Sequence, residues 1–325
     1  MAPHKPRSGS MQFWPRKRAA RQYPKVRCWP KVDKAIPLGF GGYKAGMTHV
    51  QIVDNRKNSM TKGEEIFCPV TVIECPPLKI AGVRFYKNTP YGAKVVSQIM
   101  TKVDKDLGRK ICVAKKTNEG KLNEIKPESF DDLRLIVYTQ PKIIDLKKTP
   151  ELFEIALGGS KEEKLNYAKE NLGKEIQVNN VFNEGEQVDV HAVTKGKGFQ
   201  GPVKRFGIMI RQHKSEKAIR NPGSLGGWCG QGHIMYRVAH AGQMGYHTRT
   251  EFNKQLLKIG TDPKMINPKG GFLNYGLIKT NYVLIKGSIP GPRKRLIRFN
   301  KSIRPNKKIQ TEAPTISFIS LSSKQ

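Results

Sequence analysis

Positive charge that no acid balances is the feature that most constrains how this chain can fold. The 325 residues contain 59 Lys and Arg but only 26 Asp and Glu, a formal net charge of +33. Three basic segments, 1–34, 195–220 and 291–310, hold +24 of that charge in 80 residues. Segments of this kind repel themselves and build no core, so they indicate a polyanionic partner. The rest of the chain carries only +9, an ordinary value for a globular protein.

The first basic segment is predicted to be an extended arm. Its five prolines exclude a long helix. Trp14, Tyr23 and Trp29 alternate with cations, and flat rings among cations suit stacking on bases and pairing with phosphates. The alternative is a solvated tail. The cations concerned are Arg16, Lys17, Arg18, Arg21, Lys25 and Arg27. We expect a chain that lacks residues 1–34 to keep a folded β domain.

The less basic part of the chain predicts a mainly β protein with an α/β insertion. Runs rich in β-branched and aromatic residues predict strands. They lie at 47–53, 67–75, 78–86, 133–139, 153–157, 186–194, 280–287 and 294–299, with a possible last strand at 315–321. Ser160 followed three residues later by Glu163 is a capping box, which predicts one helix that stops at Gly173.

A glycine motif, Gly196-x-Gly198-x-x-Gly201, follows the predicted strand 186–194. In a dinucleotide enzyme this motif opens a helix whose N-terminus receives the pyrophosphate. Here Pro202 comes next and no helical period follows, so we predict no helix, and the motif argues against a dinucleotide site.

The same glycine motif suits the phosphates of RNA better. It is surrounded by the cations Lys195, Lys197, Lys204 and Arg205. Cationic side chains and the backbone N–H groups that glycines expose both bind phosphate. Two roles stay open for Phe199, which either stacks on a base or fills a core.

A long Gly-rich, basic stretch continues from Lys195 to about Gly245. It far exceeds an ordinary connection, which marks it as functional or disordered. Trp228 stands among five glycines in 221–232 with no apolar periodicity around it, so we place it at a loop tip that contacts a partner. Further candidate RNA-binding residues are Arg211, Arg220, Tyr246, His247, Arg249, Arg293, Lys294 and Arg295.

Signals of catalysis, metal binding and membrane insertion are absent from the sequence. The seven histidines show no H-x-x-x-H spacing, and His49 and His191, inside predicted strands, are expected to be structural. The five cysteines form no C-x-x-C pair and are expected to be free thiols of a reducing compartment. No apolar run of 18 residues and no secretory signal occur. We therefore expect no enzyme, no cofactor and no metal.

Several ordered motifs resemble the universal ribosomal large-subunit protein L-three family. They are GFGGYKAGMTHV, VTVIECPP, VTKGKGFQGPVKRFG, GSLGGW, AGQMGYHTRTEFNKQLLKIG, GGFLNYG and KGSIPGPRKRLIRF, and FWPRKRAARQ is similar to the extension of the archaeal and eukaryotic branch. The resemblance implies a six-stranded translation-protein β-barrel with long rRNA-binding extensions. It implies an early assembly scaffold rather than a catalyst, whose excursion carries Trp228 toward the peptidyl-transferase centre. The family commonly has His or Asn and then Pro after this tryptophan, whereas this chain has Cys229 and Gly230.

The resemblance and the charge pattern together suggest a division of the chain. The parts are a basic N-terminal extension (1–34), the first part of the barrel (35–99), an α/β insertion (100–180), a barrel strand (181–194), a Gly-rich basic excursion with a tryptophan tip (195–255), and final barrel strands with a basic tail (256–325). Expected partners are large-subunit rRNA and neighbouring ribosomal proteins in the cytoplasmic ribosome. A membrane, a small-molecule substrate and a homo-oligomer are not expected.

Two other functions stay open at this stage. A sequence-tolerant DNA-compacting protein fits the charge equally well, although no helix-turn-helix, zinc finger or basic zipper is visible. A nucleotide-dependent oxidoreductase depends on the glycine motif alone.

Overall fold

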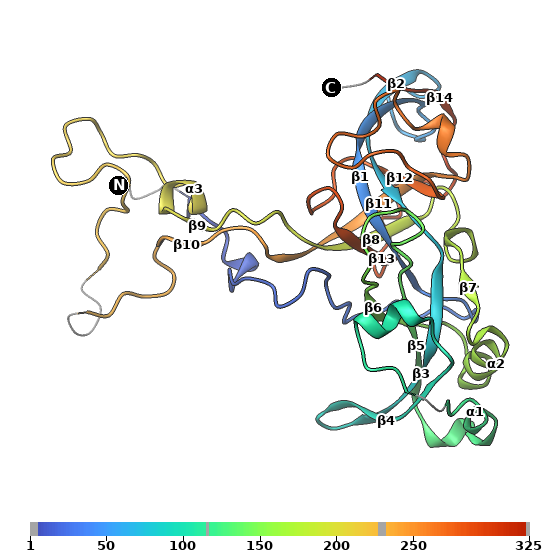
Figure 1. Cartoon of the computed structure of the whole chain (residues 1–325). Helices are drawn as coiled ribbons and strands as arrows, with labels where there is room; N and C mark the ends of the chain where they lie inside the picture. The colour runs from blue at the N-terminus through green and yellow to red at the C-terminus, as the bar shows by residue number, and fades with distance from the viewer. Residues whose placement is uncertain (1–5, 115–116, 227–231, 323–325) are drawn as a thin grey trace. The chain divides into compact units, whose positions relative to one another are not determined.

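A computed structural model describes residues 6–114, 117–226 and 232–322. The chain divides into two compact units. Unit 1 consists of Met1–Gln22 and Val193–Arg249, and unit 2 consists of Tyr23–Ala192 and Thr250–Gln325. The helices and strands of both units are labelled in Figure 1.

Strands dominate the structure, as predicted. They are β1 (Gly39–Val53), β2 (Glu65–Glu74), β3 (Leu78–Thr89), β4 (Gly92–Met100), β5 (Asp132–Tyr138), β6 (Leu152–Ala156), β7 (Glu175–Ile176), β8 (Gln187–Val193), β9 (Phe199–Gln200), β10 (Gly242–Gln243), β11 (Thr248–Gly260), β12 (Tyr282–Lys286), β13 (Leu296–Lys301) and β14 (Ile316–Ile319). The α-helices are α1 (Lys121–Glu124), α2 (Lys161–Asn171) and α3 (Pro202–Phe206). Five 3-10 turns are η1 (Met11–Phe13), η2 (Lys105–Arg109), η3 (Pro127–Ser129), η4 (Val178–Asn180) and η5 (Pro263–Met265).

The larger sheet of unit 2 closes on itself. Its strands follow the order β13-β8-β11-β12-β2-β1-β14, and β1 also pairs with β13 from Gly39↔Asn300 to Tyr43↔Leu296. The 15-residue β1 can reach two sets of partners because its register with β2 shifts between Lys44 and Gly46. Six strands therefore form a ring, with β14 added beside β1.

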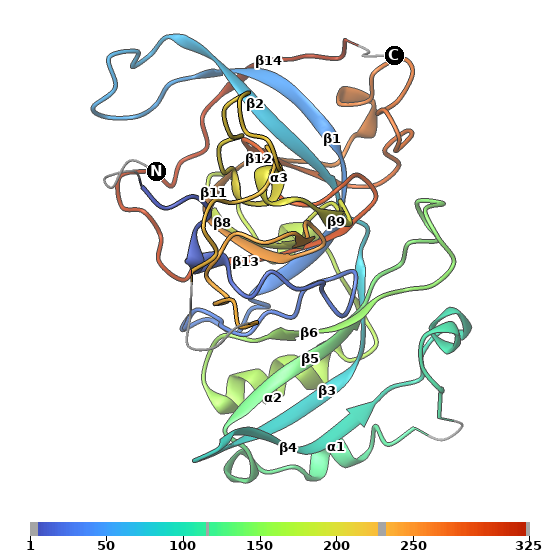
Figure 2. The same ribbon diagram turned by 90° about the vertical axis from the view of Figure 1, so that its left-hand side faces the viewer.

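The second sheet of unit 2 has the order β4-β3-β5-β6, and β7 also pairs with β3. β3 thus pairs with β5 and β7 of the expected insertion, although β3 itself lies within the segment 35–99. Figure 2 shows α2 beside β3 and β5. Leu165 and Ala168 of α2 are buried in the main hydrophobic cluster, which also contains Leu133 and Leu135 of β5.

The predicted helix is confirmed as α2. The Glu163 amide donates to Ser160 Oγ at 3.3 Å, and the Ser160 amide donates to Glu163 Oε2 at 3.0 Å, so the capping box is complete. The helix ends at Asn171, and Gly173 has φ +77°, a conformation that favours glycine.

Every strand predicted from composition occurs, including the possible last one, but the long strands β4 and β11 and the two-residue strands β7, β9 and β10 were missed. β4 is exposed over most of its length, so its sequence lacks the alternation of a half-buried strand. The first half of β11, Thr248–Lys254, is polar except for Phe252 and at most half-buried, and we had assigned it to the irregular excursion. Burial, on which the apolar pattern depends, begins only at Gln255.

His191 is structural, as predicted. It lies on β8 with 8% exposure, within hydrogen-bonding distance of Thr250 Oγ1 (2.9 Å) and Asn300 Oδ1 (2.6 Å). His49 on β1 places its ring against that of Phe67, with centroids 4.6 Å apart.

The end of the predicted arm belongs to the core of unit 2. Tyr23 is 9% exposed, lies in the main hydrophobic cluster and donates to the Leu152 carbonyl at 2.9 Å. Trp29 packs against the same cluster, and a Cβ at Gly39 would overlap its ring. Tyr23 is therefore a core residue rather than one that stacks on bases. That a chain without residues 1–34 keeps a folded β domain stays a prediction, but we now expect that domain to be less stable.

Two truncations test this assignment. Removing residues 1–22 takes nothing from the clusters of unit 2, whereas removing 1–34 also takes Tyr23, Val26 and Trp29. Losing buried aromatic side chains costs about 3–5 kcal/mol each. The longer truncation is expected to melt at least about 10 °C below the shorter one by circular dichroism. Equal melting temperatures of the two truncated chains would show that residues 23–34 do not stabilise unit 2.

A pH titration tests the environment of His191. Burial is the main cause that lowers its folded pKa below the ordinary value of 6.5, and the charge of Arg298 lowers it further. The unfolded chain therefore binds a proton that the folded chain refuses, so stability falls as pH drops below about 6.5 and levels off below the folded pKa. The melting temperature of the parent chain is expected to fall more steeply between about pH 7 and 5 than that of His191→Gln. Parallel curves would contradict the burial argument.

Candidate nucleic-acid interface

In unit 1 the Gly-rich loop after β8 runs antiparallel to the segment that returns to β11. We call this pair of segments, 194–200 and 242–247, the stalk. The Thr194 amide donates to the His247 carbonyl (2.9 Å), and the Lys197 amide donates to the Met244 carbonyl (3.0 Å). Farther along, β9 pairs with β10. Gly245 has φ +71°, and a Cβ there would collide with the Lys195 carbonyl oxygen. This glycine permits a close approach between two protein backbones, a role we had not predicted.

A helix does follow the glycine motif, contrary to our prediction. α3 is five residues long, begins with Pro202 at its first position, and ends at Gly207 with φ +69°. Five residues are too few to show a helical period in the sequence. Such a turn still fails as a dinucleotide site, because proline supplies no N–H at the helix start.

Phe206 at the end of α3 is the centre of unit 1. It is 6% exposed. The guanidinium carbons of Arg16 and Arg205 lie 4.5 and 5.0 Å from its ring centroid. The Trp14 ring meets it edge-on at 6.3 Å and meets Tyr236 at 5.3 Å. Arginine planes stack well on aromatic rings, so these two cations act as packing groups as well as charges.

The same two arginines bind backbone carbonyls. Arg205 donates from Nε to Gln243 O (3.0 Å) and from Nη1 to His240 O (2.9 Å). Arg16 donates from Nη1 to Arg205 O (3.0 Å), while its Nε is buried with no partner among the described residues. Burial lowers the pKa of both guanidiniums, and each is lowered further by a neighbouring arginine, Arg7 for Arg16 and Arg16 for Arg205. Cations therefore crowd one another here without an acid to balance them.

The return strand supplies three more predicted residues. His247 is buried, and its Nδ1 lies 2.9 Å from the Lys17 carbonyl oxygen. Tyr246 accepts from the Ala19 amide through its carbonyl at 2.8 Å. Arg249 lies over the Phe13 ring at 5.3 Å, and burial is the main cause that lowers its pKa. The side chains of His247 and Arg249 and the carbonyl of Tyr246 thus hold residues of the N-terminal arm within unit 1.

The other predicted cations of unit 1 are exposed. They are Lys17, Arg18, Arg21, Lys195, Lys197, Lys204, Arg211 and Arg220. Phe199 is 77% exposed, so of its two open roles the core-filling one is wrong. Trp228 and its neighbours lie outside the described residues, and the prediction for them stays a prediction.

In unit 2, Lys25, Arg27, Arg293 and Lys294 are exposed and Arg295 is half-buried. The loop of Arg293, Lys294 and Arg295 is held in place by Lys44, a residue that we had not predicted to have a role. Its ammonium donates to Ile289 O (2.7 Å) and Gly291 O (3.1 Å), and its own backbone exchanges hydrogen bonds with Lys294 and Arg295. Burial lowers the pKa of the Lys44 ammonium.

Unit 1 is a highly charged body without an apolar core. Its 79 residues contain 16 Lys and Arg and one acid, Glu216. Within the described ranges, no hydrophobic cluster takes a residue from it. Large apolar side chains are instead exposed, among them Met209 (71%) and Tyr236 (73%). Uncompensated cations and exposed rings together characterise a surface for nucleic acid.

Comparison with known proteins decides which nucleic-acid-binding class this is. The family described as Ribosomal protein L3 matches residues 1–325. The chain belongs to the ribosomal protein L3 family. The large ribosomal subunit protein uL3 of Archaeoglobus fulgidus is 49% identical over 328 residues, covering 99% of this chain and 98% of that protein. The uL3 proteins of Methanothermobacter thermautotrophicus (50%) and Methanococcus vannielii (47%) cover 99% and 100% of this chain and 98% and 99% of their own lengths.

Membership of the L3 family confirms the resemblance seen in the motifs. It also disposes of the DNA-compacting protein and the oxidoreductase, since no part of the chain is left over for either. No helix in the described residues has the length and apolar character needed to cross a membrane. Residues 6–114, 117–226 and 232–322 contain no group of three His, Cys, Asp or Glu side chains arranged for a metal ion.

Two substitutions separate packing from charge in unit 1. Arg205→Lys keeps the charge but loses the flat fork that reaches two carbonyls and the Phe206 ring. In Arg205→Lys we expect hydrogen–deuterium exchange of the backbone amides of Phe199–Gln200 and Gly242–Gln243 to be at least about tenfold faster. The reason is that this variant loses a charged hydrogen bond that holds the two segments together. Lys204→Ala, at an exposed neighbour, should leave exchange unchanged and reduce the salt dependence of RNA binding by about one charge. The assignment fails if the two variants behave alike.

Proposed function

We propose that this chain is a structural, non-enzymatic component of the large ribosomal subunit that binds large-subunit rRNA and supports translation in the cytoplasm. The observation that carries the proposal is unit 1, with 16 cations, one acid and no hydrophobic cluster among its described residues. A body of this kind gains stability from a polyanion that neutralises it. The relatives of the same length are named as proteins of the large ribosomal subunit, which identifies the polyanion as its rRNA.

We assign different roles to the two sets of cations in unit 1. Arg16, Arg205 and Arg249 position the stalk, because each donates to backbone carbonyls or stacks on a ring. The exposed cations contact phosphates. Phosphate contacts fix where a protein sits on RNA and carry little sequence information. Such a division suits a scaffold that acts early in assembly.

The ring of six strands in unit 2 supports a translation-protein-type β-barrel. Its closing pair is β1 with β13. We propose that β3, β4, β5, β6, β7 and α2 form the α/β insertion, which then begins near Leu78 rather than at 100. The N-terminal extension correspondingly ends near Gln22, where unit 1 ends. The excursion between β8 and β11 carries Trp228 toward the peptidyl-transferase centre, as in the family that the motifs resemble.

The partners proposed are large-subunit rRNA and neighbouring proteins of the subunit, with one copy of the chain and no small-molecule substrate. The loop of Arg293, Lys294 and Arg295, together with Lys25 and Arg27, gives unit 2 its own phosphate contacts.

Excision of the excursion tests the proposal. Excision would leave Lys195 and Tyr246 to be rejoined. These two residues already face each other, because the Tyr246 amide donates to the Lys195 carbonyl at 3.4 Å. An Asn-Gly turn can therefore replace residues 196–245. For six to ten phosphate contacts, the full chain is expected to lose about 10³- to 10⁵-fold in rRNA affinity between about 50 and 200 mM salt. The excised chain should keep a cooperative melt of unit 2 and show a much shallower salt dependence.

Competitor nucleic acid provides the control. Large-subunit rRNA should be preferred to double-stranded DNA of equal length at about 200 mM salt, because a scaffold recognises the folded shape of its RNA as well as its charge. Binding that does not weaken with salt, or equal affinity for DNA and rRNA, would overturn the proposal.

A further inference from the structure

A second basic feature lies in unit 2, outside the three basic segments. β3 and β4 form a hairpin whose free end we call the hairpin tip, residues 87–96 (Figure 1). Leu78–Met100 contains four cations and no acid. Lys79 pairs with Asp104 at 2.9 Å, and Arg84 pairs with Glu154. The two cations left over are Lys87 and Lys94.

Lys87 and Lys94 stand directly opposite each other in the ladder. Side chains opposite each other in an antiparallel pair lie close, and like charges there destabilise the hairpin. Both are exposed, and neither makes an ion pair with any described residue within 4.0 Å. The charge of Lys87 acts on Asp131 only as a minor cause of that carboxyl's lowered pKa, because Asp131 accepts from the Asn88 amide (2.8 Å) and pairs with Lys161 (3.2 Å). An outside anion would relieve the repulsion.

An aromatic ring accompanies the two lysines. Tyr91, in the turn between Thr89 and Gly92, is 101% exposed and has no hydrogen-bond partner among the described residues. A fully exposed tyrosine next to two unbalanced cations repeats at small scale the combination seen in unit 1. It is the combination that binds single-stranded nucleic acid, with phosphates on the cations and a base on the ring.

We propose that the hairpin tip is a separate rRNA-binding site, with Lys87 and Lys94 on neighbouring phosphates and Tyr91 stacked on an unpaired base. The inference rests on the proposed function, which supplies the RNA. It adds a contact from a part of the chain whose overall charge is nearly ordinary. Unpaired bases are accessible in loops, bulges and strand ends, so the site fits such an element of rRNA.

A strand from a protein partner is the competing occupant, because β4 is the edge of its sheet. Two features of the tip oppose strand addition. Lys94 puts a charge on the edge strand, and the register between β3 and β4 shifts at Phe85 and Tyr86, where Val96 bulges out of the ladder. Charged edge residues and bulges are the means by which proteins block edge-to-edge pairing. The tip is therefore better suited to RNA than to a β-strand.

Salt titration of variants tests the site. The full chain, the double variant Lys87→Ala/Lys94→Ala and the single variant Tyr91→Ala are each bound to large-subunit rRNA. The double variant should lower the log–log salt slope by about two, about one for each phosphate contact. Tyr91→Ala should weaken binding roughly 5- to 150-fold, the range for one stacked base, with the slope unchanged. Tyr91→Ala should melt at the same temperature as the full chain, since the tip is exposed, and the double variant should melt at that temperature or slightly above it, because it removes the like-charge pair.

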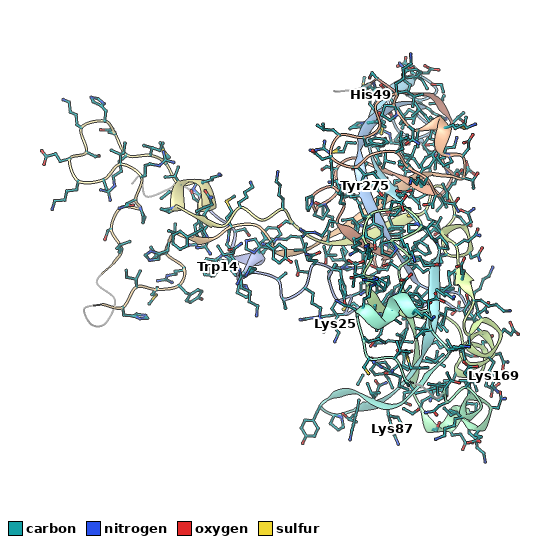
Figure 3. The ribbon with its side chains drawn as sticks, viewed as in Figure 1. Trp14, Lys25, His49, Lys87, Lys169 and Tyr275 are labelled. Atoms are coloured by element: carbon teal, nitrogen blue, oxygen red, sulfur yellow. The ribbon has the colours of Figure 1, made fainter. Side chains whose placement is uncertain are left out.

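The matched control removes two exposed lysines from elsewhere in unit 2. Lys62→Ala/Lys169→Ala makes the same change in net charge, and Figure 3 shows Lys169 on α2, apart from Lys87 on the hairpin. Lys169 lies in a helix with as many acids as cations. If the control variant lowers the log–log salt slope of rRNA binding as much as the hairpin variant does, the change reflects net charge alone. That result would overturn the inference.

Crosslinking distinguishes RNA from protein at the tip. Benzoylphenylalanine in place of Tyr91, in assembled subunits, should yield an rRNA adduct at one mapped position, and in place of Lys169 it should yield none there. A protein adduct at position 91 would assign the tip to a protein partner. If the full chain fails to bind rRNA, the proposed function fails. If it binds normally and the hairpin variants match it, only the hairpin site fails.

Discussion

The adjacency of β8 and β11 in the closed sheet is the constraint on which the rest of the structure depends. His191 on β8 contacts Thr250 on β11, and the Asn253 amide donates to Asp189. Because these strands are neighbours, the chain can leave at Val193 and return at Thr248 through paired backbones. A long excursion costs little in loop entropy when its ends are already held together. The pairing of β8 with β11 thus brings together the two ends of the excursion, whose described residues belong to no hydrophobic cluster.

Unit 1 replaces an apolar core with arginine. Phe206 lies against Arg16 and Arg205. Both guanidiniums donate to backbone carbonyls of neighbouring segments, Arg16 to Arg205 O and Arg205 to Gln243 O. This packing is specific in geometry but electrostatically unfavourable, since burial and neighbouring guanidiniums both act against the charged forms. We expect phosphates around the exposed cations to offset that repulsion. We therefore expect the stability of unit 1 to depend on the RNA that the proposed function assigns to it.

Several features could be predicted because their causes are local. The capping box of Ser160 and Glu163 needs only four residues, and buried strands such as β2 and β12 record their burial in β-branched residues. Others could not. α3 is too short to show a period, and the polar half of β11 is a strand only because β8 lies beside it. Tyr23 follows six cations in the chain, and the core residues that it packs against are distant in sequence. Its local sequence therefore does not predict its burial.

The sequence by itself determined the mainly β class, the polyanionic partner and the family, because composition, clustered charge and ordered motifs are properties of the chain that folding leaves unchanged. Only the tertiary structure decided what each cation does. Lys204 and Arg205 are neighbours in sequence, yet one is exposed and the other binds two carbonyls and a ring. The physical reason is that a side chain's role depends on what surrounds it, and those surroundings come from segments more than thirty positions away, such as His240 and Gln243.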